Sequence, residues 1–245
     1  MSFRRKMKLQ KSMPKIKIVA VVILIALAMG FIIYNFYPKI NQDLQKDRII
    51  AVAKESPVEV AADRIDFNAL VTINPDTIGW VQIDGTPLEY PVAQTDNNDF
   101  YLSHNFLKES SFEGAIFRDY LSDPVTTRNH VLYGHYMSDE SMFGSLWNYQ
   151  DQAYFKLHPV IQFDQPGNPG DWEIFSVYIT EAEYDYRQPS FANDTEFMNY
   201  MNRLKARSMY DTGVVISPTD EVLTLSTCIY TFDDARFAVH ARKIK

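Results

Sequence analysis

The stretch Val222-Leu223-Thr224-Leu225-Ser226-Thr227-Cys228 ends on the only cysteine of this 245-residue chain. Its apolar and polar residues alternate, as they do along a β-strand whose successive side chains point to opposite faces of a sheet. The run therefore predicts a strand that carries the thiol of Cys228 at its carboxyl end. A small, buried, apolar role is commoner for a cysteine, but it fits poorly beside the polar Ser226 and Thr227. We infer that Cys228 is a candidate nucleophile.

Arg236 begins the next strand-like run, and only residues 229–235 separate it from Cys228. A hairpin of this length places the start of the second strand beside the end of the first, so the guanidinium group of Arg236 comes within reach of the sulfur. The five N–H donors of an arginine suit the stabilisation of an oxyanion formed there. The alternative is a solvated arginine, or one that pairs with Asp233 or Asp234.

A catalytic cysteine usually works with a histidine, which stabilises the thiolate and protonates a leaving amine. Among the five histidines, His135 has the most suitable position. It follows the apolar run Val131-Leu132-Tyr133 and then Gly134, at the point where the chain leaves the sheet, and a glycine permits close approach of the backbone. The alternatives are histidines in or beside loops: His104, His130 and His158.

The N-terminal residues predict a membrane anchor. Residues 1–17 carry seven Lys or Arg side chains and no acidic one, and residues 18–38 form an uncharged, largely apolar run of 21. At about 1.5 Å per residue, a helix of this length spans the roughly 30 Å hydrocarbon core of a bilayer. The positive-inside rule then puts residues 1–17 in the cytoplasm as a basic tail, and the chain from about Lys39 onward outside. The alternative is a cleaved signal peptide.

The chain beyond residue 17 is strongly acidic. It holds 17 basic against 31 acidic side chains, a formal charge of −14. Such a surface repels phosphates, so we exclude nucleic acid as a partner. An amphipathic run at 41–54 predicts a helical linker over 39–60. This leaves 61–245 as one extracellular catalytic domain of a protein that crosses the cell membrane once.

Motifs for metals and cofactors are missing from the sequence. It contains no pair of cysteines, no HExxH run, no glycine-rich phosphate loop and no dinucleotide-binding fingerprint. We therefore expect neither a metal site nor a cofactor. A single cysteine cannot form a disulfide within the chain, and exported domains often use cysteines in pairs. A lone thiol in such a domain is therefore an inert buried residue, one half of an intermolecular bridge, or a reactive group.

Short apolar or alternating runs, bounded by turn residues, predict strands over much of the chain after residue 76. Besides 222–227 and 237–244 they are 79–83, 88–92, 114–117, 130–133, 160–163, 173–180 and 214–217. One clear helix interrupts them, with Asn193 as its N-cap and apolar residues at near-helical spacing beyond it. This pattern indicates a mainly antiparallel β-barrel or sandwich.

The chain resembles the sortases, the membrane-anchored cysteine transpeptidases of Gram-positive bacteria, and in particular class B. The resemblance covers about residues 40–245. It rests first on Thr224–Cys228 with Arg236, and on Tyr133-Gly134-His135. Further runs that look like class B are Ile73–Trp80, Tyr90-Pro91-Val92, Asp96–Leu102, Gly114–Phe117 and the helix near 194–207.

The resemblance implies a closed eight-stranded sortase-type β-barrel with N-terminal helices and one long helix before the strand of the catalytic cysteine. It implies that Cys228 attacks the Thr–Gly or Thr–Asn bond of a sorting signal in a secreted protein. His135 would act as acid and base, and Arg236 would steady the substrate or the oxyanion. The positions that match the family's peptide groove are Asn98, Leu102, Tyr133, Ser226 and Thr227.

The resemblance also implies that the thioacyl enzyme passes the secreted protein to an amine of a lipid-linked peptidoglycan precursor. Ile229 departs from the polar or acidic residue that often follows the cysteine. One alternative is a pilus-assembling class B sortase, which joins pilin subunits through lysine. A hydrolytic cysteine protease, or a membrane-anchored binding module with an incidental cysteine, is a weaker alternative.

Overall fold

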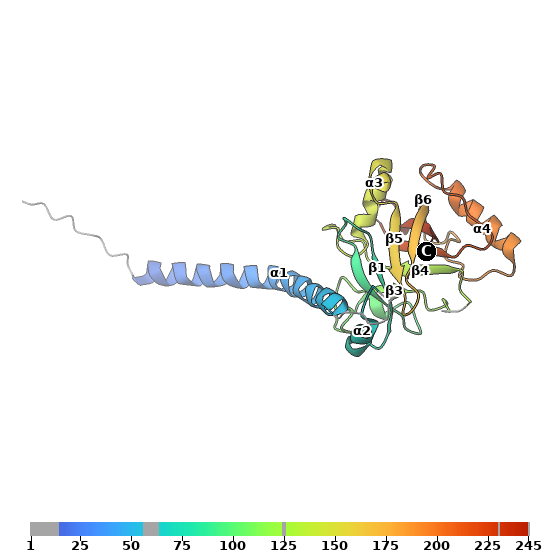
Figure 1. Ribbon diagram of the computed structural model, residues 1–245. Helices are drawn as coiled ribbons and strands as arrows, with labels where there is room; N and C mark the ends of the chain where they lie inside the picture. The colour runs from blue at the N-terminus through green and yellow to red at the C-terminus, as the bar shows by residue number, and fades with distance from the viewer. Residues whose placement is uncertain (1–14, 56–63, 124–125, 230, 245) are drawn as a thin grey trace, which may run out of the picture. The chain divides into compact units, whose positions relative to one another are not determined.

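The computed structural model describes residues 15–55, 64–123, 126–229 and 231–244 (Figure 1). The chain divides into two compact units, Met1–Arg48 and Ile49–Lys245. The second unit holds the whole barrel and every predicted site residue.

One long helix, α1 (Lys15–Glu55), contains both predicted N-terminal helices, and Pro38 lies inside it. Its stretch Val22–Lys54 is 33 residues long and contains an 18-residue window with a mean hydropathy of 1.6, so it is long and apolar enough to cross a membrane. Large apolar side chains such as Leu24 and Phe31 are more than half exposed. The end of the predicted linker, 56–60, lies outside the described residues.

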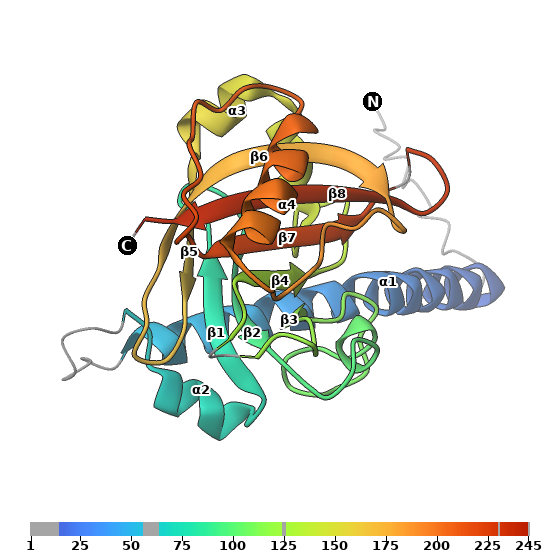
Figure 2. The ribbon, with the colours of Figure 1, turned by 90° about the vertical axis from the view of Figure 1, so that its right-hand side faces the viewer.

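Eight strands form a closed barrel in the order β1-β2-β3-β4-β7-β8-β6-β5 (Figures 1 and 2). The pairs β2–β3 and β4–β7 are parallel, and the other pairs are antiparallel. The predicted eight-stranded barrel is therefore confirmed, with a mixed sheet. The strands are β1 (Thr77–Gln82), β2 (Glu89–Ala93), β3 (Ile116–Arg118), β4 (Asn129–Tyr133), β5 (Val160–Asp164), β6 (Asp171–Glu181), β7 (Val222–Cys228) and β8 (Ala235–Lys243).

The strand predicted at 214–217 is wrong. Val214 and Ile216 are buried in the cluster beneath α4 (Asp194–Ala206), but they join no ladder. Both edges of β7 are already paired, with β4 on one side and β8 on the other. The apolar alternation at 214–217 thus reflects burial of one face of an extended loop rather than sheet pairing.

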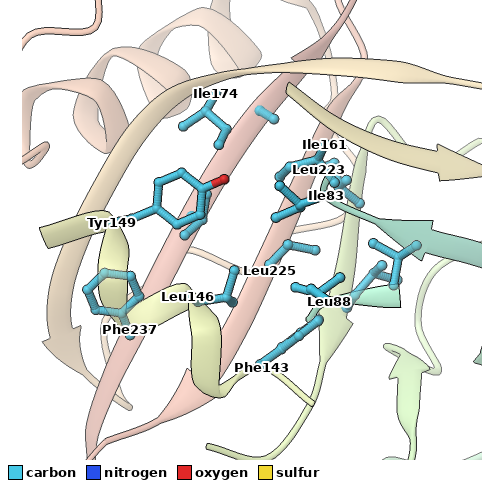
Figure 3. Close-up of a cluster of buried hydrophobic side chains, with 14 of the residues drawn as sticks. Ile83, Leu88, Phe143, Leu146, Tyr149, Ile161, Ile174, Leu223, Leu225 and Phe237 are labelled. Atoms are coloured by element: carbon cyan, nitrogen blue, oxygen red, sulfur yellow. The ribbon is translucent and has the colours of Figure 1, made fainter. Parts of the chain in front are cut away.

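The barrel interior is filled by alternate residues of the strands. Leu223 and Leu225 of β7 point inward with Phe237 of β8, as Figure 3 shows. The outer face of β6, β7 and β8 is covered by α4 (Figure 2), and Tyr178 of β6 belongs to the same buried cluster as Met201 of α4. Asn193 caps α4 as predicted, because its side chain accepts a 3.0 Å hydrogen bond from the amide of Glu196.

The remaining helices are short and were mostly missed by the sequence pattern. Helix α2 (Phe67–Ile73) packs with the C-terminal turns of α1 from Ile49 onward against β1 and β3. The other short helices are η1 (Phe100–Leu102), η2 (Gly144–Gln150) and α3 (Gln152–Leu157). Sequence alternation did not predict η2 and α3, which lie between β4 and β5.

Candidate active site

Cys228 and Arg236 are direct partners in the antiparallel ladder of β7 and β8. Alternation along β7 points Leu225 into the core and leaves Cys228 on the outer face of the barrel, where the cysteine is exposed. Arg236 lies on the same face, half-buried. Within the described residues it makes no ion pair with Asp233 or Asp234, and its Nη1 donates to the carbonyl of Ala235 at 3.1 Å. The predicted hairpin, which pairs the end of the first strand with the start of the second, is confirmed.

His135 reaches the same edge through the parallel pairing of β4 and β7. Tyr133 is the partner of Ser226, and the amide of Gly134 donates to the carbonyl of Ser226 at 3.3 Å. Two residues further along each strand's path come His135 and Cys228. Because parallel strands end at the same edge of a sheet, both side chains project where the chains leave the barrel wall.

The imidazole of His135 is oriented by a backbone carbonyl. Its Nε2 lies 2.7 Å from the carbonyl oxygen of Leu102. A carbonyl can only accept, so Nε2 carries the hydrogen. A Cβ built on Gly114 would lie 3.2 Å from His135 Cδ2, so the Cδ2–Nε2 edge of the ring lies against the segment that follows η1. Nδ1 is on the opposite edge of the ring.

The peptide bond before His135 is tightly packed. A Cβ at Gly134 would lie 2.4 Å from Ile116 Cδ1 and 2.9 Å from the ring of Phe143. The amide of Phe143 also donates to the carbonyl of His135 at 3.0 Å. Glycine is therefore required at residue 134 by close approach, as its position in the sequence predicted.

Asp119 binds two of the predicted groove residues. Its Oδ2 accepts hydrogen bonds from the hydroxyl of Tyr133 at 2.7 Å and from the side-chain amide of Asn98 at 3.1 Å. The Asn98 side chain in turn accepts from the amide of Tyr120 at 3.0 Å. Burial, and secondarily the hydrogen bond to Asp119, raise the pKa of Tyr133 far above that of a free tyrosine. Asp119 follows β3 and carries no sequence signal that separates it from an ordinary turn residue.

The other predicted groove residues differ in exposure. The side chain of Leu102 is exposed, whereas Ser226 and Thr227 are buried. Ser226 Oγ lies 2.8 Å from the hydroxyl of Tyr186, a fully buried residue of the loop after β6. Thr227 points toward the barrel interior, because it alternates with the outward-facing Ser226 and Cys228.

Tyr186 and Arg187 were not predicted as site residues. Burial raises the pKa of Tyr186, and its hydroxyl is close enough to Cys228 and Arg236 for their charges to influence it. Burial by itself would lower the pKa of Arg187. The neighbouring Tyr133, Tyr186 and Asp119 raise it by more, so the net pKa lies above that of a free arginine. Both residues lie in a loop that is distant from residue 228 in the sequence. Nothing in the sequence around them indicates that they lie near Cys228.

In the part of the chain that the structure describes, no group of three or more His, Cys, Asp or Glu side chains is placed to hold a metal ion. The site therefore consists of a thiol, an imidazole and a guanidinium group on one edge of the barrel. These three groups can attack a carbonyl, exchange a proton with an amine and stabilise an oxyanion.

Comparison with known proteins finds similarity to the sortases. A family model described as a sortase domain matches residues 81–244. Sortase B of Listeria monocytogenes is 36% identical over 166 residues, which cover 67% of this chain and 68% of that protein. The structure of sortase B from Bacillus anthracis in complex with AAEK1 is 34% identical, with a TM-score of 0.78 over 86% of this chain and 99% of that chain. The Staphylococcus aureus sortase B–substrate complex is 31% identical, with a TM-score of 0.73 over 84% and 94% of the two chains.

Proposed function

The chain belongs to the sortase family, as a cysteine transpeptidase of the sortase B type, and from this premise we propose that it cleaves a C-terminal sorting signal at a Thr–Gly or Thr–Asn bond. The observation that carries the proposal is the meeting of Cys228, His135 and Arg236 on one edge of the barrel. The product is a secreted protein joined covalently to an amine of a cell-wall precursor.

The chemistry follows from the three side chains. Cys228 Sγ, as the thiolate, attacks the carbonyl carbon of the signal's threonine, and the negative charge passes to the carbonyl oxygen beside Arg236. The tetrahedral intermediate breaks its C–N bond as His135 gives a proton to the departing amine, which leaves a thioester on Cys228. A second amine then attacks the thioester and gives a proton to His135, and the thiolate is restored.

The predicted groove residues position the signal along the outer face of β4 and β7. Leu102 offers an exposed apolar side chain beside His135. Tyr133 and Asn98 offer a surface that Asp119 fixes. Ser226 and Thr227 act from below this surface, by fixing Tyr186 and the carbonyl group of Cys228.

The apolar helix supports an anchored enzyme. We propose residues 1–17 as a cytoplasmic tail, 18–38 as the membrane span, 39–60 as a linker and 61–245 as the extracellular catalytic domain. Such an enzyme has two substrates, an exported protein and a lipid-linked peptidoglycan precursor. Both meet it at the outer surface of the cell membrane. Tethering all three to one surface raises their effective concentration.

The full chain in detergent micelles, incubated with peptides of the NPxTN, SPxTG and LPxTG types, tests the proposal. We expect cleavage of at least one of the three, and its loss in both Cys228→Ala and His135→Ala, with unchanged thermal unfolding as the control for folding. Addition of a glycine, a diaminopimelate or a lysine side-chain amine shows which acceptor chemistry the thioacyl enzyme takes. Cleavage that survives Cys228→Ala would contradict the proposal.

A further inference from the structure

A pocket lies at the mouth of the barrel, directly beyond the catalytic edge. Among the described residues, its lining comes from Tyr136, Trp147, Ile229 and Thr231, and we call it the mouth pocket. Two of the four follow the catalytic residues in the chain: Tyr136 comes after His135, and Ile229 comes after Cys228. Because β4 and β7 are parallel and end together, residues that follow both strands meet beyond the same edge.

Ile229, which lines the mouth pocket, and its chain neighbour Cys228 face in different directions. Ile229 is 4% exposed and packs with the barrel interior, whereas Cys228 faces outward. The ring of Trp147 lies 6.2 Å from that of Tyr136 and 5.8 Å from that of the inward-facing Phe237. An acyl chain on the outer face of β4 and β7 would therefore leave the pocket side of the thioester open to a second substrate.

The chemistry of the mouth pocket is aromatic and aliphatic inside, with acidic loops around it. The two loops that supply the lining, residues 136–147 and 229–235, contain no Lys or Arg. They carry the exposed acidic side chains of Asp139, Glu140, Asp233 and Asp234. Acidic loops attract a cation, and aromatic walls pack well against the methylene stem of an alkyl amine and against its ammonium group.

We propose that the mouth pocket binds the acceptor of the second half-reaction, as the side chain of a lysine-type residue with its primary amine directed at the thioester. This inference rests on the proposed function and adds the acceptor's binding site and chemical class. The amine loses its proton to His135 as its nitrogen bonds to the thioester carbon and the C–S bond breaks. Since the leaving amine received its proton from the same imidazole, both amines pass on the His135 side of Cys228.

Ile229 gains a role in this arrangement. An acidic residue at this position would add a fixed charge within the pocket, beside the thiol. The buried, uncharged Ile229 instead gives the pocket an apolar wall, which suits four methylene groups better than it suits glycine.

The thioacyl enzyme reacts either with water or with an amine, and the ratio of aminolysis to hydrolysis tests the proposal. This ratio does not depend on how fast the thioester forms. The full chain in micelles is given a cleavable signal peptide and Nα-acetyl-lysine methylamide, and the hydrolysed and aminolysed products are counted. Thr231→Trp fills the pocket and Trp147→Ala removes its wall. Thr219→Trp, at an exposed position on the loop before β7, is the matched control.

We expect the aminolysis-to-hydrolysis ratio to fall about tenfold or more in Thr231→Trp and Trp147→Ala, and to stay at the wild-type value in Thr219→Trp. In the wild type, the lysine probe should be favoured over glycinamide and over a diaminopimelate amide, whose extra carboxylate meets the acidic loops. An unchanged ratio in both pocket variants, or a preference for glycinamide, overturns the pocket assignment alone. If the wild type does not cleave the signal peptide at all, the proposed function is contradicted, and the pocket assignment that rests on it is contradicted too.

Discussion

Nε2 of His135 donates a hydrogen bond to the carbonyl oxygen of Leu102 at 2.7 Å. This contact fixes both the tautomer and the rotation of the imidazole, the task that a carboxylate performs in many nucleophile–histidine pairs. The acceptor is a backbone atom, so its presence depends on the path of the chain after η1 and not on the side chain of residue 102. In the proposed reaction, Nδ1 is therefore the nitrogen that exchanges a proton with substrate.

The tautomer of His135 can be checked against two other histidines. In His104 and His158 it is Nδ1 that lies 2.9 and 2.8 Å from a backbone carbonyl, so those rings carry the hydrogen on Nδ1. Long-range ¹H–¹⁵N spectra at neutral pH should show the Nε2–H form for His135 and the Nδ1–H form for the other two. An Nδ1–H form of neutral His135 would show that Leu102 does not orient the ring.

Arg236→Ala should lower kcat about 10²–10³-fold, the usual cost of losing an oxyanion donor. Arg236→Lys should recover only part of this loss, because an ammonium group lacks the planar fork of donors. Arg242→Ala is the matched control, since Arg242 shares the strand and the face but pairs with Glu173 at 2.9 Å. Steady-state cleavage of the signal peptide measures all three, and equal losses in Arg236→Ala and Arg242→Ala would refute a specific role.

Gly134→Ala should displace His135 and destabilise the fold by about 1–3 kcal/mol, because its Cβ would overlap Ile116 Cδ1. Ile116→Val removes that Cδ1 atom. The double variant Gly134→Ala/Ile116→Val should therefore recover part of both the activity and the stability, as measured by cleavage and by urea unfolding. If the double variant recovers neither activity nor stability, the overlap with Ile116 is not the cause of the loss. The strain then comes from the backbone or from the ring of Phe143.

Asp119→Ala should raise KM for the signal peptide more than it lowers kcat. The substitution leaves the buried hydroxyl of Tyr133 without its acceptor, at a cost of about 1–3 kcal/mol in stability. If Asp119 acts through Tyr133, then the effects of Asp119→Ala and Tyr133→Phe on KM are not additive. Asp96→Ala, an exposed carboxylate before η1, serves as the control and should leave KM unchanged.

His240 makes the barrel sensitive to acid. Burial lowers the pKa of His240 from 6.5 to about 3. Thr224 donates its hydroxyl hydrogen to Asn129, so it accepts from Nδ1 of His240, while Nε2 lies 2.8 Å from the hydroxyl of Tyr178. The neutral ring satisfies this network, and a second ring proton does not.

Between pH 6.5 and about 3, His240 is protonated in the unfolded chain but not in the folded one. The unfolded state then binds more protons, so stability falls as the pH falls, by up to about 1.4 kcal/mol per pH unit from this group. Urea unfolding at several pH values should show a steeper loss for the wild type than for His240→Gln. Parallel curves for the two proteins would exclude His240 as the cause.

Local sequence determined the features that depend on neighbouring residues. Alternation predicted β7 and β8, the short connection predicted the pairing of Cys228 with Arg236, and the cap at Asn193 predicted the start of α4. The same reasoning added a false strand at 214–217, because alternation reports burial of one face and not the presence of a pairing partner.

Only the tertiary structure decided which distant segments meet. The parallel pairing of β4 with β7 brings His135 to Cys228, and no local pattern encodes that choice of neighbour. The binding of Tyr133 by Asp119, the carbonyl of Leu102 at His135 and the mouth pocket have the same origin. Each of these three features depends on side chains or backbone atoms from separate elements. They arise from closure of the barrel and not from any one stretch of sequence.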